Sequence, residues 1–474
     1  MLFSSSVFLF QFLPLVLALY YIFFRGRRGA QNLLLLVASL FFYAWGEPRF
    51  LFIMVLSIAM NYGFGLWVYR WKQQCRYLTT PIAAAVSCNL ALLFVFKYLV
   101  FTVESLNCLG LVIPVPGIAL PIGISFFTFQ ALSYVLDVAS GKAEVQRSPL
   151  ALGLYISFFP QLIAGPIVKY ASVAQQIDGR KETWADFSAG CVRFLTGLGK
   201  KVLIANQMAV VADRVFAMDP AALSTPMAWL GALCYTFQIY YDFSGYSDMA
   251  IGLGKMFGFH FAENFDHPYA SRSITEFWRR WHISLSSWFR DYLYIPLGGN
   301  RVPPKRHVFN LFVVWLLTGF WHGANWTFVA WGLFYFLLLV LEKYCRLGKN
   351  WPGVFQRLYT LLAVNFLWML FRADTLAHAG QFFLAMLGFG GSARYDAASL
   401  LYLRENAVIL LLALLFSGGF ALWLKEQLPR LHPAGHDLSL LWDLLYTFGM
   451  AVIALVSAAC LVKGTYNPFI YFRF

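Results

Sequence analysis

Residues 50–69 read FLFIMVLSIAMNYGFGLWVY, a run of apolar, small and aromatic residues that contains no charged side chain. A helix needs about 20 such residues to cross the hydrocarbon core of a bilayer. A helix also satisfies its own backbone hydrogen bonds, which a lone strand or loop inside a membrane does not. The stretch therefore predicts a transmembrane helix.

The composition of the whole chain agrees with this prediction. Of its 474 residues, 60% are hydrophobic, 19% are aromatic and 12% are charged, whereas soluble domains carry about 25% charged residues. The mean hydropathy is +0.64. These values exclude soluble, secreted, coiled-coil and disordered classes. They predict an all-α polytopic membrane protein, with a single membrane-embedded domain over residues 1–474.

Apolar runs of spanning or nearly spanning length extend from end to end. We expect them at 7–24, 32–45, 50–69, 81–101, 120–139, 150–168, 201–217, 226–242, 308–321, 326–341, 354–371, 405–424 and 440–462. Several are shorter than a full span, so some are expected to be tilted, re-entrant or buried in the bundle. Segment 150–168 is basic on both sides and contains two prolines, which favours a re-entrant helix.

Basic residues orient the chain. Arg25, Arg27 and Arg28 follow the first expected span, whereas residues 102–119 contain no Lys or Arg. Cytoplasmic loops collect basic residues, so the 25–30 loop is expected in the cytoplasm and the N-terminus on the other side. The net charge of +14 then needs no nucleic acid as partner, because anionic membrane lipid explains it. The polar segment 260–307 is expected to be interfacial, on the cytoplasmic side.

Within that segment, Ser273 and Glu276 form the pattern of a capping box, which predicts that a helix begins there. Continued to Arg290, the helix has an aromatic face with Trp278, Trp281 and Trp288, with His282 at its edge. The opposite face carries Arg279, Arg280 and Arg290. Such a helix anchors a protein at the membrane interface. Clustered arginines also suit the phosphates of a donor such as coenzyme A, and periodicity alone favours neither interpretation.

A second histidine, His322, lies between two apolar runs in LLTGFWHGANW (316–326). Thr318 and Asn325 are four residues before and three residues after it, so all three are expected to share a helix face. A polar group at membrane depth is costly unless it is used or paired, which makes His322 a candidate catalytic residue. A neutral imidazole suits general-base chemistry near pH 7. The alternative is a structural histidine packed against Trp321.

A third polar stretch, QIYYDFSGYSD (238–248), is expected at the end of a span. Asp242 and Ser244 are candidate site residues there. The carboxylates of Asp242 and Asp248 could orient a histidine or hold a basic side chain. The stronger alternative is that the acidic residues pair with arginines of loops.

Other classes of function have weaker support. The chain has no G-x-S-x-G, H-E-x-x-H or P-loop motif, and its eight histidines are spread singly, so no metal site is expected. A transporter or polymer flippase would also be polytopic and basic inside, but the related halves that transporters often show are not visible.

Seven stretches stand out together: Met1–Tyr21, PIGISF (121–126), FPQLIAGP (159–166), Tyr241–Gly252, Ser273–Tyr294, GGNR (298–301) and WHGAN (321–325). This ordered set resembles the membrane-bound O-acyltransferase family, in the bacterial exopolysaccharide branch typified by the membrane subunit of alginate O-acetylation. The resemblance runs nearly end to end. It implies a helical bundle with re-entrant and interfacial helices around a central tunnel in the bacterial inner membrane.

The resemblance also implies an activity and its residues. His322 would be the catalytic histidine and His282 a second polar position at the cytoplasmic mouth of the tunnel. The donor would be acetyl-CoA, with no tightly bound cofactor. The acetyl group would pass toward a periplasmic hydroxyl acceptor through periplasmic acetyltransferase or esterase-like partner proteins. Alginate is the first candidate polymer, and acetylated cellulose or another exopolysaccharide would fit the same chemistry.

Overall fold

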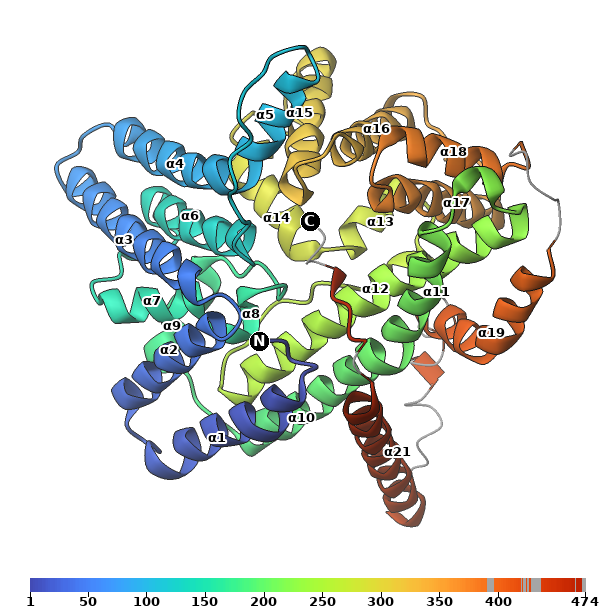
Figure 1. Ribbon diagram of the computed structural model, residues 1–474. Helices are drawn as coiled ribbons and strands as arrows, with labels where there is room; N and C mark the ends of the chain where they lie inside the picture. The colour runs from blue at the N-terminus through green and yellow to red at the C-terminus, as the bar shows by residue number, and fades with distance from the viewer. Residues whose placement is uncertain are drawn as a thin grey trace. The chain divides into compact units, whose positions relative to one another are not determined.

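The protein is an assembly of helices, seen here in a computed structural model (Figure 1). The structure describes residues 1–389, 396–418, 420, 423, 426–427, 436–464 and 466–470, apart from the side chains of 436–442. No strand occurs in this described part. The chain divides into two compact units. Unit 1 comprises Met1–Phe194 and Ser247–Ala262, and unit 2 comprises Leu195–Tyr246 and Glu263–Phe474.

Unit 1 contains the N-terminal helices. They are η1 (Phe8–Phe12), α1 (Leu13–Ala18), η2 (Leu19–Phe23), α2 (Arg28–Ala44), η3 (Pro48–Phe50), α3 (Leu51–Gln73), α4 (Thr79–Leu93), η4 (Phe94–Tyr98), α5 (Leu99–Asn107), α6 (Ile124–Ser140), α7 (Pro149–Ser157), α8 (Phe159–Leu162), α9 (Tyr170–Gly179) and most of α10 (Trp184–Gly199). The last turns of α12 also belong to this unit.

Unit 2 contains the helices that follow. They are η5 (Lys200–Ala205), α11 (Asn206–Phe216), η6 (Pro220–Ala222), most of α12 (Thr225–Met256), η7 (Pro268–Ala270), α13 (Ile274–Arg280), α14 (Ile283–Phe289), η8 (Arg290–Tyr294), α15 (Pro304–His322), α16 (Trp326–Tyr344), α17 (Gly353–Arg372), α18 (Leu376–Met386), α19 (Ala397–Ser417) and α21 (His436–Lys463).

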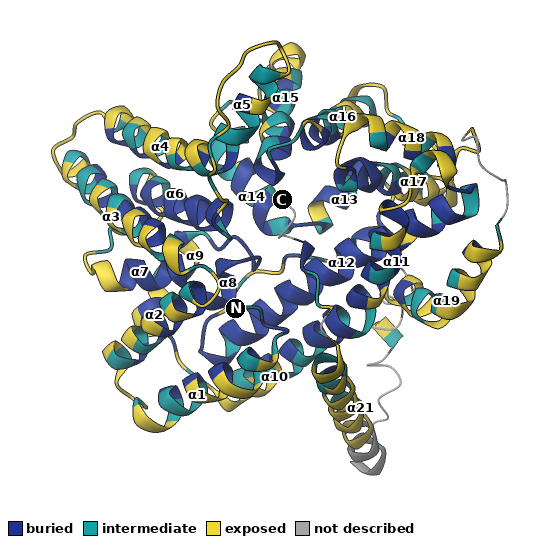
Figure 2. Ribbon diagram, in the orientation of Figure 1, coloured by how far each residue is buried: buried dark blue, intermediate teal, exposed yellow. Residues whose placement is uncertain are grey.

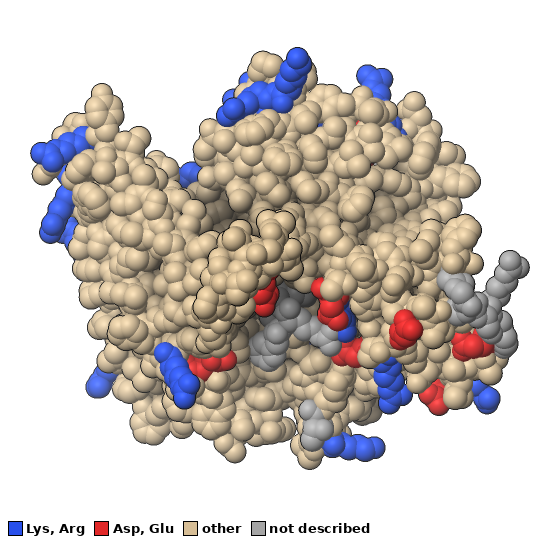
Figure 3. All heavy atoms as spheres, turned by 45° about the horizontal axis from the view of Figure 1, so that its top comes forward, with Lys and Arg blue, Asp and Glu red and all other residues tan. Residues whose placement is uncertain are grey.

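Six helices in the described part are long and apolar enough to cross a membrane. They cover Pro48–Gln73, Thr79–Asn107, Trp326–Tyr344, Gly353–Arg372, Ala397–Ser417 and Asp443–Lys463. This confirms the predicted all-α polytopic class. The expected span 405–424 falls partly on positions 419, 421–422 and 424, which lie outside the described residues. Much of the surface in Figure 3 carries neither acidic nor basic side chains, as expected where lipid is the solvent.

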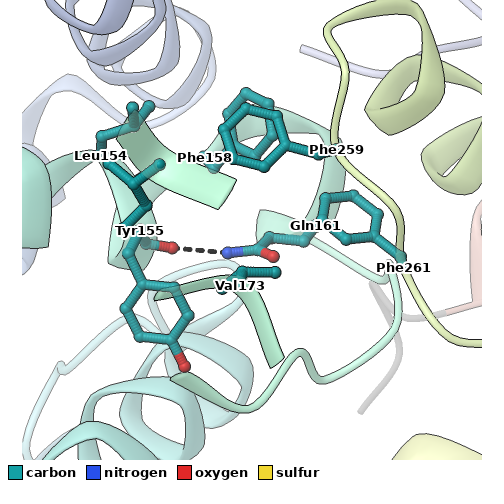
Figure 4. A pocket seen from close by; sticks show the side chains of 8 residues that line it. Leu154, Tyr155, Phe158, Gln161, Val173, Phe259 and Phe261 are labelled. Carbon is teal, nitrogen blue, oxygen red and sulfur yellow. Dashed lines mark hydrogen bonds between the residues drawn. The ribbon is translucent and has the colours of Figure 1, made fainter. Parts of the chain in front are cut away.

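Some apolar segments lie inside the bundle, as expected. Residues 124–135 of α6 are all buried, and α6 packs against α3, α4, α7 and α9 (Figure 2). In segment 150–168, α7 is nine residues long, which is too short to cross a bilayer as a helix. The amide of Gln161 donates to the carbonyl oxygen of Tyr155 beside a cavity of about 10 Å³ (Figure 4). That cavity has room for one water molecule at most, so it is a packing feature.

One expected boundary is wrong. The polar stretch 238–248 does not end a span, because α12 continues as one helix to Met256. Both carboxylates within it are neutralised by partners on neighbouring helical segments: Asp242 by Lys201, and Asp248 by Arg193. Paired carboxylates are tolerated inside a helix bundle, so the polar stretch does not interrupt the helix.

Candidate active site

The helix predicted to begin at Ser273 is confirmed. The Ser273 hydroxyl accepts from the backbone N–H of Glu276 at 3.0 Å and caps α13. The carboxylate of Glu342, on α16, accepts from the backbone N–H groups of Ile274 and Thr275 at 2.6 and 2.9 Å. The N-terminal turn of α13 therefore has partners for its free N–H groups and a negative charge at its positive end. Helix α13 is thereby fixed to α16.

The single amphipathic helix expected over 273–290 is wrong. The structure has two short helices, α13 and α14, with a break at Trp281 and His282. His282 adopts a left-handed conformation, with φ 45° and ψ 54°. Outside glycine this conformation is uncommon and costs about 1–3 kcal/mol, so the surrounding structure must hold it. The break turns His282 fully inward instead of placing it at the edge of an aromatic face.

Asn264 holds this break in place. Its backbone carbonyl accepts from the N–H of Ile283 at 3.0 Å. Its side-chain Oδ1 accepts from the N–H and the hydroxyl of Ser284 at 3.1 and 2.9 Å, and lies 3.2 Å from Nδ1 of His282. One residue thus caps α14 and contacts the histidine. No local sequence pattern points to Asn264, because its partners lie 18 to 20 residues later.

The imidazole of His282 is fully enclosed by the protein. Its ring packs edge-to-face against Phe243 at 4.6 Å between centroids, and the side chain has no exposed surface. Burial lowers the pKa of His282 to about 3, because the charged form loses its hydration. The imidazole is therefore neutral at physiological pH. Its Nε2 is buried and makes no hydrogen bond within the described residues.

His322 is the last residue of α15 and lies in a cage of aromatic rings. The rings of Trp321, Trp331 and Phe371 lie 5.0, 5.0 and 5.2 Å from its own, all nearly perpendicular to it. The side chain is buried, at 7% exposure. Such a cage excludes water from the imidazole, which strengthens any electrostatic interaction there.

The expectation that Asn325 shares a helix face with His322 is wrong, because α15 ends at His322. Asn325 instead begins α16, where its Oδ1 accepts from the backbone N–H of Thr327 at 3.0 Å. Its amide donates to the carbonyl oxygen of Asp374 at 2.9 Å. Gly323 lies between the helices, where a Cβ would overlap the ring of Phe328. The turn after His322 thus requires a residue without a side chain.

Trp321 brings the two histidines together. Its ring contacts that of His282 at 5.9 Å and that of His322 at 5.0 Å between centroids. The two imidazoles therefore lie no farther apart than the sum of these distances. Because they come from different helices, their proximity depends on the break between α13 and α14.

A cavity of about 290 Å³ lies among α13, α14, η8, α15 and α16. Arg279 and Arg290 line it, together with the aromatic rings of Trp278 and Trp315. Thr318 also lines it, one helical turn before His322, with its hydroxyl donating to the carbonyl oxygen of Val314 at 2.7 Å. The two histidines do not line the cavity itself.

The arginines expected to act together differ in their surroundings. Arg279 is exposed and makes no ion pair or hydrogen bond within the described residues. Arg290 is exposed and pairs with its neighbour Asp291 at 2.7 Å. Arg280 pairs with Glu276 at 2.8 Å and is not among the residues that line the cavity. Two of the three thus border the cavity.

Asp242 does not line the cavity and lies beside residues 468–470. Its Oδ1 lies 2.8 Å from Nζ of Lys201, and its Oδ2 accepts from the backbone N–H of Ile470 at 2.9 Å. Lys201 also donates to the carbonyl oxygen of Pro468. Ser244 is buried without a hydrogen bond in the described part. Asp242 therefore holds a basic side chain, as one of its expected roles required, and fixes residues 468–470.

Comparison with known proteins identifies a family and several relatives. The model of the family described as MBOAT, membrane-bound O-acyltransferase family, matches residues 37–378. "Probable alginate O-acetylase AlgI" of Pseudomonas putida is 44% identical, over the full length of both chains. The protein of that name from Pseudomonas aeruginosa is 46% identical, over 82% of this chain and 75% of its own. "Peptidoglycan O-acetyltransferase" of Helicobacter pylori is 34% identical, over 98% of this chain and 90% of its own.

The family match covers more than half of the chain, including α13, α14, both histidines and the cavity. The six apolar helices agree with a protein embedded in the membrane. This multi-pass membrane protein belongs to the membrane-bound O-acyltransferase family.

Proposed function

We propose that this O-acetyltransferase takes an acetyl group from acetyl-CoA on the cytoplasmic side of the inner membrane. The group would pass toward a periplasmic hydroxyl for O-acetylation of an exopolysaccharide, with alginate as the first candidate. The observation that carries the proposal is the caged His322, one helical turn beyond a cavity bordered by Arg279 and Arg290. The names of the relatives, alginate O-acetylase and peptidoglycan O-acetyltransferase, support polymer acetylation.

The cavity suits a donor with an anionic end and a narrow apolar end. Its volume of about 290 Å³ is close to the lower limit of small-molecule sites, about 300 Å³. Two guanidinium groups at its border can form charge-assisted hydrogen bonds with phosphates. An acyl-pantetheine arm would then extend along the rings of Trp278 and Trp315, which pack against each other at 4.8 Å between centroids, toward Thr318.

His322 would act as general base. It would take the proton of the attacking hydroxyl as the oxygen forms a bond to the thioester carbonyl carbon. The tetrahedral intermediate would then break its C–S bond, and the proton would pass to the leaving thiolate. Thr318 or a backbone N–H near the end of α15 would stabilise the oxyanion. For Thr318 this requires its hydroxyl to turn away from Val314, its present partner.

Two expected residues would support the reaction in other ways. Trp321 contacts both histidine rings and would set their separation. Asn325 holds the turn after His322 through Thr327 and Asp374, so we propose a structural role for it. The N-terminus would be periplasmic, and periplasmic acetyltransferase or esterase-like proteins would deliver the group to the polymer.

The acceptor is tested in cells that lack this protein. NMR of the exported polysaccharides should show loss of O-acetyl groups from one polymer, and the wild-type gene should restore them. Loss from alginate supports the first candidate, whereas loss from cellulose or another polymer redirects the assignment. Inside-out membrane vesicles given labelled acetyl-CoA should transfer label to that polymer. Label that never leaves acetyl-CoA would contradict the proposed donor.

A further inference from the structure

Asn264 makes a contact with His282 that determines where the imidazole carries its proton. Oδ1 of Asn264 accepts from the backbone N–H of Ser284 at 3.1 Å, and an N–H group can only donate. The orientation of the amide is therefore fixed, with its oxygen toward Nδ1 of His282 at 3.2 Å. Because an amide oxygen only accepts, the proton of a neutral His282 must lie on Nδ1.

The other ring nitrogen then has a lone pair and no proton. Nε2 of His282 is buried and makes no hydrogen bond within the described residues. A buried acceptor of this kind destabilises the protein unless a partner donates a hydrogen bond to it. The oxygen atoms of Asn264 contact Nδ1 of His282 and accept from the first two N–H groups of α14, directly beside the left-handed residue. The local structure thus presents one acceptor atom in a fixed direction.

We propose that Asn264 is a positioning residue that keeps His282 in the Nδ1–H tautomer, so that Nε2 accepts a hydrogen bond from an N–H or O–H group of the substrate. The inference rests on the proposed function, which supplies two such groups. They are the amide N–H groups of the donor's pantetheine arm and the hydroxyl of the acceptor.

This role differs from that of His322. Burial lowers the pKa of His282 to about 3, so its ring does not hold a second proton near pH 7. His282 therefore orients a substrate group by accepting a hydrogen bond, while proton transfer belongs to His322. A His282 that donated a hydrogen bond to the thioester would need its proton on Nε2, and the contact with Asn264 disfavours that tautomer.

Among the described residues, the side chains that contact the ring of His282 carry no charge. They are Phe243 on α12, Asn264 and Ser284 around the break, and Trp321 on α15. Titratable or charged groups on the surrounding elements have a partner or a ring contact: Asp242 with Lys201, Asp266 with His267, Arg280 with Glu276, and His322 with Trp321. A carboxylate at position 264 would be the first charge in direct contact with the imidazole.

The substitution Asn264→Asp tests the proposal. It keeps an acceptor oxygen for Ser284 but adds a negative charge beside Nδ1–H, which raises the pKa of His282. Below the new pKa, Nε2 is protonated and no longer accepts. The rate of acetyl transfer by the full-length variant in proteoliposomes should fall about tenfold between pH 8.5 and pH 6. This decrease is measured relative to that of wild type over the same pH range. If KM for acetyl-CoA changes with pH in the variant, the group that donates to Nε2 is an amide of the donor. If the dependence of the rate on acceptor concentration changes with pH instead, that group is the acceptor hydroxyl.

A matched control is Ser284→Ala, which removes one donor to the same oxygen without adding charge. Its pH profile should keep the wild-type shape. If Asn264→Asp is not recovered folded, Asn264→Ala serves, because it frees both tautomers and should lower transfer by about one to two orders of magnitude. Wild-type transfer by Asn264→Ala would overturn the proposal.

A second measurement does not depend on acetyl transfer. The melting temperature of wild type should fall as pH decreases below 6.5, whereas that of Asn264→Asp should fall less, because its His282 is charged in the folded state. Failure of wild type to use acetyl-CoA would count against the proposed function alone. The role of Asn264 would be overturned if wild type and Asn264→Asp had the same pH profile of acetyl transfer and the same pH dependence of the melting temperature.

Discussion

Nζ of Lys201 lies 2.8 Å from Oδ1 of Asp242, and both side chains are about 2% exposed or less. This buried ion pair joins η5 to α12 and also binds the backbone of Pro468 and Ile470. The next residue of α12, Phe243, contacts the ring of His282. The pair therefore connects the C-terminal segment 468–470 with the helix that supports the site.

Asp242→Asn should lower the stability of the protein strongly. The substitution leaves the ammonium of Lys201 buried without its counter-charge, which typically costs about 3–5 kcal/mol. Thermal melting of the purified protein in detergent measures the effect. The double variant Lys201→Met with Asp242→Asn removes both charges and keeps an oxygen for the N–H of Ile470. It should melt at a higher temperature than Asp242→Asn alone.

The control is Glu276→Gln, which removes the charge from a partly exposed pair with Arg280, whose side chains are 28–33% exposed. Exposed pairs contribute about 0–1 kcal/mol, so this variant should melt close to wild type. Equal melting temperatures for Asp242→Asn and wild type would show that the buried pair does not stabilise the fold.

Arg279→Ala combined with Arg290→Ala should raise KM for acetyl-CoA several-fold with a smaller effect on kcat. The reason is that both guanidinium groups border the cavity, where they would bind phosphates before the chemical step. Initial rates at varied acetyl-CoA concentration provide the measurement. Arg280→Ala is the matched control, because Arg280 pairs with Glu276 away from the cavity lining. An unchanged KM in the double variant means that these arginines do not bind the donor.

Acid should destabilise the protein partly through His282. Its pKa is about 3 in the folded protein, against 6.5 as the ordinary value. Between these values the unfolded chain binds a proton that the folded chain does not, so stability decreases as pH falls from 6.5 toward 3. Melting curves across this range should show a weaker decrease for His282→Asn than for wild type. Parallel curves would mean that His282 is not buried in its neutral form.

Gly323→Ala should reduce activity, because a Cβ there overlaps the ring of Phe328. That ring packs on Phe371, which forms part of the cage around His322. Overpacking of this kind costs about 1–3 kcal/mol and would shift the cage. Gly353→Ala is a suitable control, since a Cβ there meets nothing within 4 Å. Transfer rates of the two variants should differ, and equal rates would show that the cage tolerates the displacement.

The sequence was sufficient for the fold class and for the main candidates, because these depend on local signals. Uncharged apolar runs predict membrane helices, and the Ser273 pattern predicts a helix start that the structure confirms. His282 and His322 stand out because ionisable groups are rare among aromatic residues. Residue types alone therefore point to the two histidines of the candidate site.

The remaining features depend on contacts between distant residues. The break at His282 requires Asn264, 18 residues earlier, which no helical periodicity reveals. The continuation of α12 past Asp242 requires the charge of Lys201 on another helical segment. The cavity forms only when five elements pack together, because Arg279, Arg290 and Thr318 line it from different elements. Such partners become visible only when the chain is folded.

The most direct test is the substitution His322→Gln, with polymer O-acetylation measured by NMR in cells that lack the wild-type protein. Immunoblots of the membrane fraction should first show that the variant inserts at wild-type levels. Loss of O-acetyl groups, with restoration by wild type, is the result we predict, because glutamine cannot take the hydroxyl proton. Normal O-acetylation by an inserted His322→Gln protein would contradict the assignment of His322 as the catalytic base.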